Sequence, residues 1–220
     1  MDSYRIIYKG GSGEIVEKKS RFIAEVHPVT EEEQAMQILE ETRKKYWDAR
    51  HHCWAYILGR NPAAERMSDD GEPAGTAGKP ILEVIRGREL TNVLVIVTRY
   101  FGGTLLGTGG LVRAYTAATV EGLNQSESIT KIHGVKLKMD TNYTDLGKIQ
   151  YLLGNRGIHQ LEPVYTDKVE MTALVPTEEM GALRTELMEG TNGQIRMDET
   201  VECWFADTED GLKVFEEWSN

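Results

Sequence analysis

The stretch VLVIVTRYFGGTLLGTGGLVRAYTAATVEGL, residues 93–123, decides the fold. It opens with an unbroken apolar run, which predicts a strand over residues 91–101 that is covered on both faces. A glycine-rich loop follows, and apolar residues at helical spacing then predict a helix over residues 109–124 that ends near Gly122. A buried strand that feeds a helix in this way is typical of a layered α+β or α/β domain.

The preceding residues extend this pattern toward the N-terminus. Residues 30–49 predict a helix that Thr30 caps, with Glu33 completing a capping box. Residues 60–80 are rich in Gly, Ala and Pro and predict a long loop. The remaining expected elements are strands at 4–10, 20–29 and 51–59, a turn at 10–14, and a short helix at 80–90 with proline in its first turn.

The C-terminal part has a different order of expected elements, with strand, helix, two strands, helix and strand in about 80 residues. This βαββαβ order is that of a ferredoxin-like domain. The sequence therefore predicts a two-domain α+β protein, with a boundary near residues 128–134. The expected domains are residues 1–133, built on a mixed sheet with helices, and residues 134–220.

Composition limits the function classes. The chain carries a net charge of −10, and residues 134–220 hold 8 Lys and Arg against 17 Asp and Glu. Such acidity argues against a general nucleic-acid coat protein, although a local basic patch in residues 1–133 stays open. Cys53 and Cys203 are expected to be reduced thiols, and no zinc pattern is present. No apolar run is long enough for a membrane span and no signal peptide is readable, so we expect a cytoplasmic protein without a membrane partner.

The glycine-rich loop is the first candidate site. Glycine permits positive φ and close approach of a partner, and the amides at the start of the following helix favour an anion. Arg99 and Arg113 are both expected beside it, so a phosphate group is the natural ligand. The loop lacks the Lys of a P-loop, and Val112 stands where the dinucleotide fingerprint requires Gly or Ala. A purely structural turn is the alternative. The loop glycines are Gly102, Gly103, Gly107, Gly109 and Gly110.

The loop SDDGEPAGTAGKP, residues 68–80, is the second candidate site. Asp69, Asp70 and Glu72 have the chemistry to chelate a hard cation or to act as acid and base, and Lys79 is suited to an anion. Solvated turn residues are the plainer interpretation of these carboxylates.

A third group lies on strands. Adjacent strand residues face opposite ways, so His51 and His52 are not expected to share a face or a metal ion. We expect Cys53 to be a small buried residue rather than a nucleophile. In KKSRF, residues 18–22, cations alternate with Phe22 and suit nucleic acid, although a solvated strand face fits equally well.

Several blocks resemble those of one family. From Gly78 to Gly107 the spacing of Ile, Leu, TRYFGG and LG resembles the signature of the Impact family, in particular its bacterial YigZ-like branch. ARHHCWAY and SDDGEPAGTAGKP are also similar to blocks of that family. The resemblance implies an N-terminal domain of the type shared by a small-subunit ribosomal protein and domain IV of elongation factor G. It also implies a ferredoxin-like second domain similar to domain V of that factor, and a role in translation through RNA or the ribosome.

Our leading hypothesis is accordingly a non-enzymatic cytoplasmic factor that binds RNA or the ribosome and regulates translation, without a cofactor or a metal. Two alternatives stay open. One is a hydrolase-like enzyme for a phosphorylated or small anionic substrate that uses the acidic loop. The other is a protein-interaction regulator with Tyr100 or Phe101 as anchor. The residues expected to contact the anion or nucleic acid are Lys19, Arg21, Lys79, Arg99, Tyr100, Gly102, Gly103, Gly107, Gly109 and Arg113.

Overall fold

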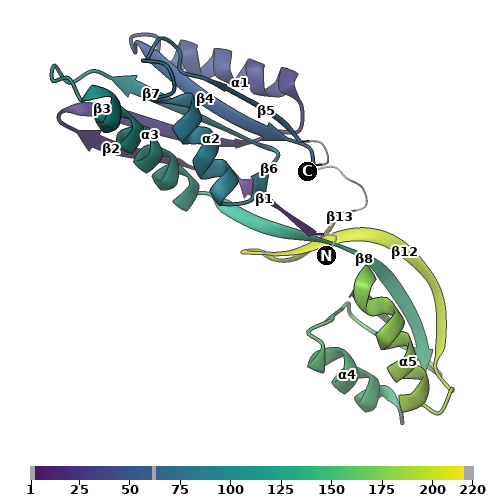
Figure 1. The fold of residues 1–220 in the computed structure, drawn as a ribbon. Coiled ribbons are helices and arrows are strands. Elements are labelled where there is room, and N and C mark those ends of the chain that lie inside the picture. The colour runs from purple at the N-terminus through teal and green to yellow at the C-terminus, as the bar shows by residue number, and fades with distance from the viewer. Residues whose placement is uncertain (1–2, 61–62, 216–220) are drawn as a thin grey trace. The chain divides into compact units, whose positions relative to one another are not determined.

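The computed structural model describes residues 3–60 and 63–215 and divides into two compact units (Figure 1). The first unit comprises Tyr4–Thr130, and the second is built from Lys131 onward. Each unit combines a β-sheet with helices, so the two-domain α+β architecture is the one predicted. Among the described residues, no helix is both long and apolar enough to cross a membrane.

The first unit is centred on a five-stranded antiparallel sheet with the order β2-β3-β7-β4-β5. The apolar strand β7 lies in the middle, which explains why its run of Val, Leu and Ile is unbroken. The strands are β2 (Ser12–Glu17), β3 (Ser20–Pro28), β4 (His51–Leu58), β5 (Ala64–Ser68) and β7 (Val93–Tyr100).

Helices cover both faces of this sheet. Val93, Val95 and Val97 of β7 face the helices α2 (Gly78–Gly87) and α3 (Gly107–Asn124), while Leu94 and Ile96 face α1 (Glu32–Lys45). Figure 1 shows α1 on one side of the sheet and α2 with α3 on the other. Two apolar cores result, and burial of these side chains is the main stabilising contribution.

The first unit also contains a short pair of parallel strands. Strand β1 (Ser3–Lys9) pairs in parallel with β6 (Leu90–Thr91), and Arg5 and Lys9 of β1 contact residues 128 and 127 at the start of β8 (Glu127–Thr141). β8 then continues into the second unit.

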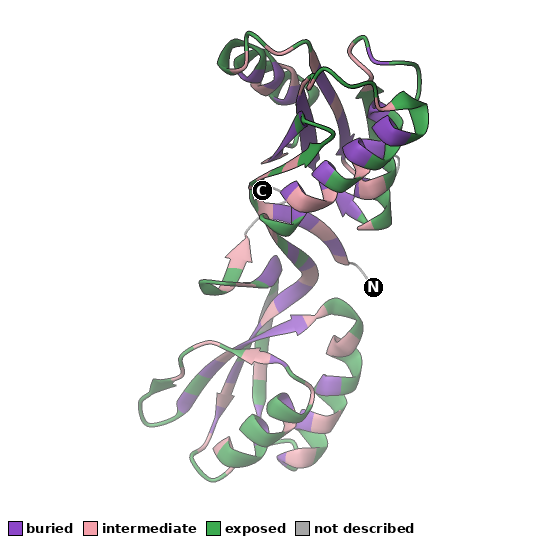
Figure 2. Ribbon diagram, turned by 90° about the vertical axis from the view of Figure 1, so that its left-hand side faces the viewer, coloured by how far each residue is buried: buried purple, intermediate pink, exposed green. Residues whose placement is uncertain are grey.

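The second unit has an antiparallel sheet in which β8 lies between β11 and β12. Its helices α4 and α5 bury Leu137, Leu153 and Leu183 with their neighbours on one face, and Figure 2 colours such buried residues purple. The element order agrees with the predicted βαββαβ, except that the second predicted strand consists of two short strands, β9 and β10, and that one more strand, β13, follows at the end. The elements after β8 are α4 (Leu146–Asn155), β9 (His159–Gln160), β10 (Val164–Tyr165), β11 (Val169–Pro176), a 3-10 turn (Thr177–Glu179), α5 (Met180–Gly190), β12 (Arg196–Thr208) and β13 (Gly211–Phe215).

The prediction of a turn at residues 10–14 is wrong, because residues 12–17 form β2. The turn that joins β2 to β3 lies at Lys18 and Lys19. The glycines here serve packing. A Cβ on Gly13 would come within 2.8 Å of the backbone of Gly122 in α3, so the strand needs glycine where the helix crosses it.

Two smaller expectations are also corrected. Strand β5 lies inside the expected loop 60–80. Thr30 does not cap α1, since Glu31 occupies the N-cap position without a side-chain cap and the Thr30 N–H donates to the Gln34 side chain at 3.1 Å.

Candidate functional site

Four connections of the first unit meet at one end of its five-stranded sheet. They are the β2–β3 turn, the turn between α1 and β4, the loop between β5 and α2, and the loop between β7 and α3. Register places Arg21 opposite Tyr100, and Phe22 and His51 on either side of Arg99. We call residues 18–21, 46–51, 69–79 and 99–113 the loop end. Every site residue predicted from the sequence lies in the loop end, apart from His52, which directly follows it.

The two histidines face opposite sides of the sheet, as predicted. His51 donates its Nδ1–H to the carbonyl oxygen of Asp70 at 2.9 Å. His52 is buried toward α1, and its Nε2 lies 3.2 Å from the carbonyl oxygen of Tyr46. Burial lowers the pKa of His52 and therefore favours the neutral ring. The described residues contain no group of three or more His, Cys, Asp or Glu side chains placed to hold a metal ion.

Asp69 organises the acidic loop. Its carboxylate accepts backbone N–H groups from Gly75 at 2.8 Å, from Ala77 at 3.0 Å and from Gly78 at 2.9 Å. Burial alone would raise the pKa of Asp69, but these three donors stabilise the charged form and the net effect lowers the pKa. The carboxylate thus fastens the loop to the first turn of α2.

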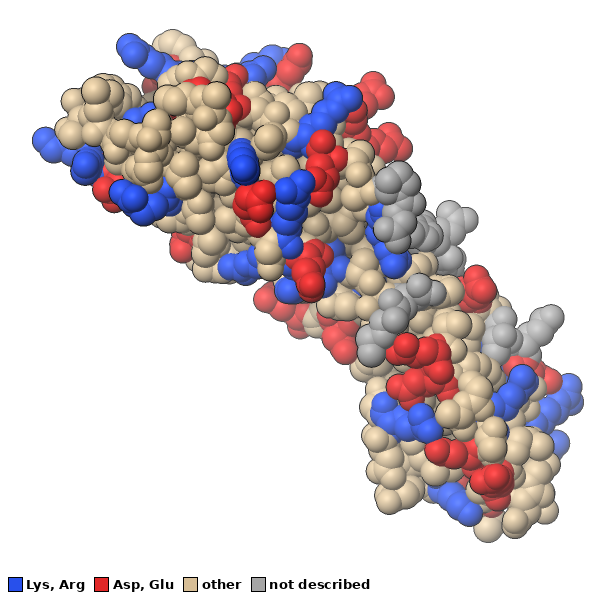
Figure 3. Space-filling view, in the orientation of Figure 1, with Lys and Arg blue, Asp and Glu red and all other residues tan. Residues whose placement is uncertain are grey.

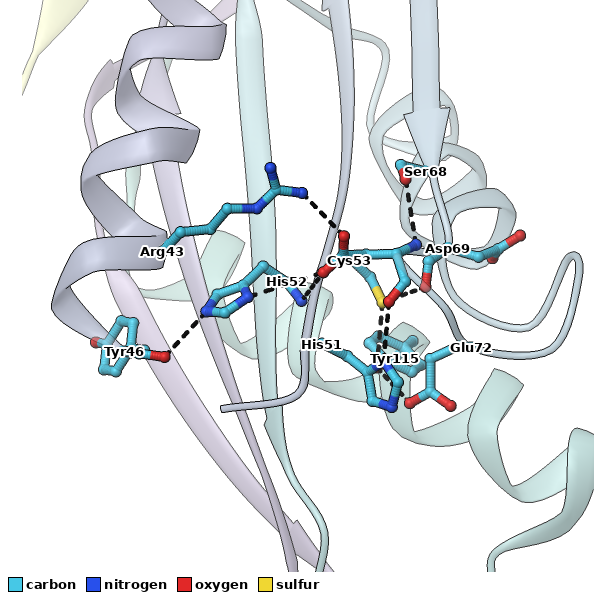
Figure 4. A network of polar contacts seen from close by, with 10 residues as sticks. Arg43, Tyr46, His51, His52, Cys53, Ser68, Asp69, Glu72 and Tyr115 are labelled. Carbon is cyan, nitrogen blue, oxygen red and sulfur yellow. Dashed lines mark hydrogen bonds and ion pairs between the residues drawn. The ribbon is translucent and has the colours of Figure 1, made fainter. Parts of the chain in front are cut away.

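The other two carboxylates also accept hydrogen bonds from protein groups, and Figure 4 labels Glu72 beside Tyr115. Asp70 accepts from Arg43 Nη2 at 2.9 Å and from the His52 backbone N–H at 2.7 Å. Glu72 is buried and accepts from Arg99 Nη1 at 2.6 Å and from the Tyr115 hydroxyl at 2.8 Å. Each of the three acids is therefore hydrogen-bonded to protein donors.

Glu72 is the centre of a buried network that the sequence does not predict. The Arg99 guanidinium lies over the rings of Phe22 and Phe101, 5.4 and 5.6 Å from their centroids. The Cys53 sulfur lies 3.3 Å from the Tyr115 hydroxyl oxygen. Burial raises the pKa values of both Cys53 and Tyr115, so both are protonated, and Cys53 is the inert buried thiol expected from the sequence.

The loop glycines have distinct roles. A Cβ on Gly102 would lie 2.1 Å from the carbonyl carbon of Lys19, and the Gly102 N–H donates to Ser20 Oγ at 3.0 Å. The close partner of Gly102 is therefore the β2–β3 turn of the same chain rather than a ligand. Gly103 and Gly107 have φ values of 83° and 70°, which other residues adopt at a cost. Gly109 lies beside the guanidinium of Arg113.

The predicted cations differ in availability. Arg99 is buried and ion-paired, and Arg21 makes a bidentate contact with Glu14 at 2.8 and 2.9 Å. Lys19, Lys79 and Arg113 have exposed side chains, and Arg113 lies in the second turn of α3. Figure 3 shows Lys and Arg gathered at the left-hand end of the first unit, where Figure 1 draws the β2–β3 turn.

The loop end also carries exposed apolar side chains. The exposed fraction is 81% for Trp47, 84% for Leu105 and 47% for Phe101. The turn that carries Trp47 is tied to the sheet, because Tyr100 donates its hydroxyl to Asp48 at 2.8 Å. Neither Trp47 nor Leu105 is predicted from the sequence, since composition and periodicity do not show that one large apolar residue in a connection stays outside the core.

Comparison with known proteins agrees with this architecture. The family model described as the Impact N-terminal domain matches residues 18–123, and a domain of unknown function, DUF1949, matches residues 140–194. The chain is 39% identical to the IMPACT family member YvyE of Bacillus subtilis, covering 88% of this chain and 89% of that protein. It is 34% identical to the IMPACT family member YigZ of Escherichia coli, covering 82% and 89%.

A solved structure extends the likeness to three dimensions. The crystal structure of a hypothetical protein with 33% sequence identity covers 90% of this chain and 97% of its own, with a TM-score of 0.58. Both units of the chain thus have matched counterparts, and the relatives are matched over most of their length. The chain belongs to the IMPACT family.

Proposed function

We propose that the protein is a non-enzymatic cytoplasmic factor that binds RNA or the ribosome through the loop end and thereby regulates translation. The observation that carries the proposal is the mixture of exposed cations and exposed aromatic or apolar side chains at this one end. Cations contact phosphates, and exposed rings stack on bases. The translational part rests on the resemblance of the two predicted domains, residues 1–133 and 134–220, to domains IV and V of elongation factor G.

The distribution of charge favours the approach of RNA to the loop end. Residues 134–220 are strongly acidic and repel a polyanion, whereas Lys18, Lys19, Lys79 and Arg113 extend exposed side chains from the loop end. An RNA strand is therefore drawn toward this end and kept away from the acidic part. Arg99 supports the surface indirectly, because its ion pair with Glu72 joins the two glycine-rich loops.

The enzymatic alternative has less support. A hydrolase needs an acid, a base or a metal-bound water that faces the substrate, and Asp69, Asp70 and Glu72 each already have protein donors. A protein-binding role has one specific observation in its favour, the 84% exposure of Leu105. In that case Leu105→Ala would abolish capture of a partner after nuclease treatment, whereas RNA binding would persist.

Filter binding of RNA across a salt series tests the proposal. The variant Lys79→Glu with Arg113→Glu reverses two exposed charges on helices, and Lys148→Glu with Lys168→Glu is the matched control at exposed positions of the second unit. We expect the affinity of the wild-type protein for RNA to fall as salt rises. The Lys79→Glu, Arg113→Glu variant should bind RNA more weakly and show a smaller salt dependence, whereas the control variant should bind as the wild type does. Ribosome co-sedimentation should give the same ranking. Absence of binding at low salt, or equal loss in both variants, would overturn the proposal.

A further inference from the structure

We infer that the loop end takes single-stranded rather than duplex RNA, and that Trp47 stacks on an unpaired base. This inference rests on the proposed function and names its substrate class. Trp47 is one of the exposed apolar side chains of the first unit. Trp47 exposes 81% of its surface, although tryptophan is highly buried on average.

The backbone beneath Trp47 is held on both sides. The carbonyl oxygen of the preceding residue, Tyr46, lies 3.2 Å from His52 Nε2. The Tyr46 N–H donates to the carbonyl oxygen of Thr42 at 3.0 Å, and the Tyr46 hydroxyl donates to the Glu25 carboxylate at 3.4 Å. The following residue, Asp48, accepts the Tyr100 hydroxyl at 2.8 Å. The indole therefore projects from a fixed turn, so that little conformational entropy is lost when a flat ligand stacks on it.

Two exposed cations lie close to Trp47 in the sequence. Lys44 and Arg50 are exposed within three residues of Trp47 along the chain. The Asp48–Tyr100 bond connects the turn to a second aromatic, and the Arg21 guanidinium lies 5.6 Å from the centroid of the Tyr100 ring. Exposed cations and aromatic rings thus occur together at this end of the first unit, and proteins that bind single strands combine cations for phosphates with rings for bases.

Duplex RNA fits this surface less well. Its bases are stacked inside the helix, its major groove is narrow, and it offers mainly phosphates and 2′-hydroxyls to a protein. A protruding indole gains nothing from such a ligand, whereas the unstacked bases of a single strand each present a flat face. The cations alone would bind both forms, so the difference between them measures the contribution of Trp47.

The experiment compares a short unstructured RNA, oligouridine, with a duplex of equal length on the full chain. Trp47→Ala should weaken oligouridine binding about tenfold, Trp47→Phe should retain most of it, and duplex binding should stay unchanged in both. The salt dependence should also be unchanged, since no charge is removed. Unfolding by urea checks that the exposed substitution leaves the fold intact.

The outcomes separate this inference from the proposed function. Equal affinity for both RNAs, together with an unaffected Trp47→Ala variant, would overturn single-strand stacking while RNA binding itself stands. Failure of both RNAs to bind at low salt would overturn the proposed function and this inference with it. Loss of a protein partner but not of RNA in Trp47→Ala would assign the indole to a protein interface and likewise contradict the inference.

Discussion

Glu72 and Arg99 form a buried ion pair, with Oε1 and Nη1 2.6 Å apart and side chains that are only 3% and 7% exposed. The pair connects the loop before α2 with the end of β7 across 27 positions of sequence. The Tyr115 hydroxyl of α3 donates to the same carboxylate oxygen. Three elements that support the loop end are thus joined at one buried atom.

Breaking this pair should be costly. Glu72→Gln or Arg99→Met alone leaves its partner without the interaction that compensates its burial, and each should lower the free energy of unfolding by about 3–5 kcal/mol. The double variant removes both groups and should cost less than the sum of the two single variants. Urea unfolding of the four proteins measures this coupling. Strictly additive single effects would show that the pair does not stabilise the fold as a unit.

Asp69 should make stability depend on pH in the acid range. Its folded-state pKa is lowered below the ordinary value of about 3.9 by three backbone donors that outweigh burial. The stabilisation is therefore complete above about pH 4 and is lost as pH falls through the folded pKa. At pH 7, Asp69→Ala should lower the free energy of unfolding by about 1–3 kcal/mol.

The pH profile of Asp69→Ala provides the check. The difference in unfolding free energy between wild type and variant should shrink as the medium is acidified below about pH 4. Asp69→Asn keeps an acceptor oxygen and should lie between the two proteins at neutral pH. A difference that stays constant down to acid pH would contradict the role given to the carboxylate.

The sequence predicts those elements whose signal is local and periodic. The apolar run of β7, the helix α3 and the order of elements in the second unit all follow from hydrophobic spacing. Strand β2 is not predicted, because Gly11 and Gly13 are typical of a turn. In the structure Gly13 makes room for α3, and Gly11 makes room for the two residues that follow this helix. β5 is not predicted either, because its exposed, polar residues carry no apolar alternation.

The sequence predicts which residues belong to the candidate site, but it does not predict which of them contact one another. The opposite orientation of His51 and His52 follows from strand geometry alone. The pairing of Glu72 with Arg99 does not, since it depends on the path of an irregular loop. The sequence therefore places Arg99 beside a phosphate, although its guanidinium is directed to a carboxylate. The exposure of Trp47 cannot be predicted from the sequence either, because tryptophan is usually a core residue.

Gly102 and Gly87 offer a matched pair of substitutions. Gly102→Ala would place a Cβ 2.1 Å from backbone of the β2–β3 turn, and should lower the free energy of unfolding by about 1–3 kcal/mol or more. Gly87 lies in α2, where an added Cβ would meet no atom within 4 Å, so Gly87→Ala should be neutral or stabilising by up to about 1 kcal/mol. Thermal unfolding distinguishes them, and equal effects would refute the packing role of Gly102.

Lys18 and Lys19 form a two-residue hairpin turn with φ values of 46° and 68°. Both values are positive, as a type I′ turn requires, and Asn-Gly is the sequence that adopts it best. Lysine at such a position is strained by about 1–2 kcal/mol, and strain of this kind concentrates at functional sites. Lys18→Asn with Lys19→Gly should therefore raise the free energy of unfolding by about 1–2 kcal/mol.

The same variant should bind RNA more weakly, because it removes two exposed cations from the loop end. The slope of log affinity against log salt should fall by about 1.4 for a single strand. Lys18→Gln with Lys19→Gln is the control, since it removes the charges while keeping side chains in the strained turn. We expect equal losses of binding in both variants but a gain of stability only in the Asn-Gly variant. A stabilised Asn-Gly variant that binds RNA as tightly as wild type would show that the lysines do not contact phosphate, and would leave their strained conformation without a purpose in binding.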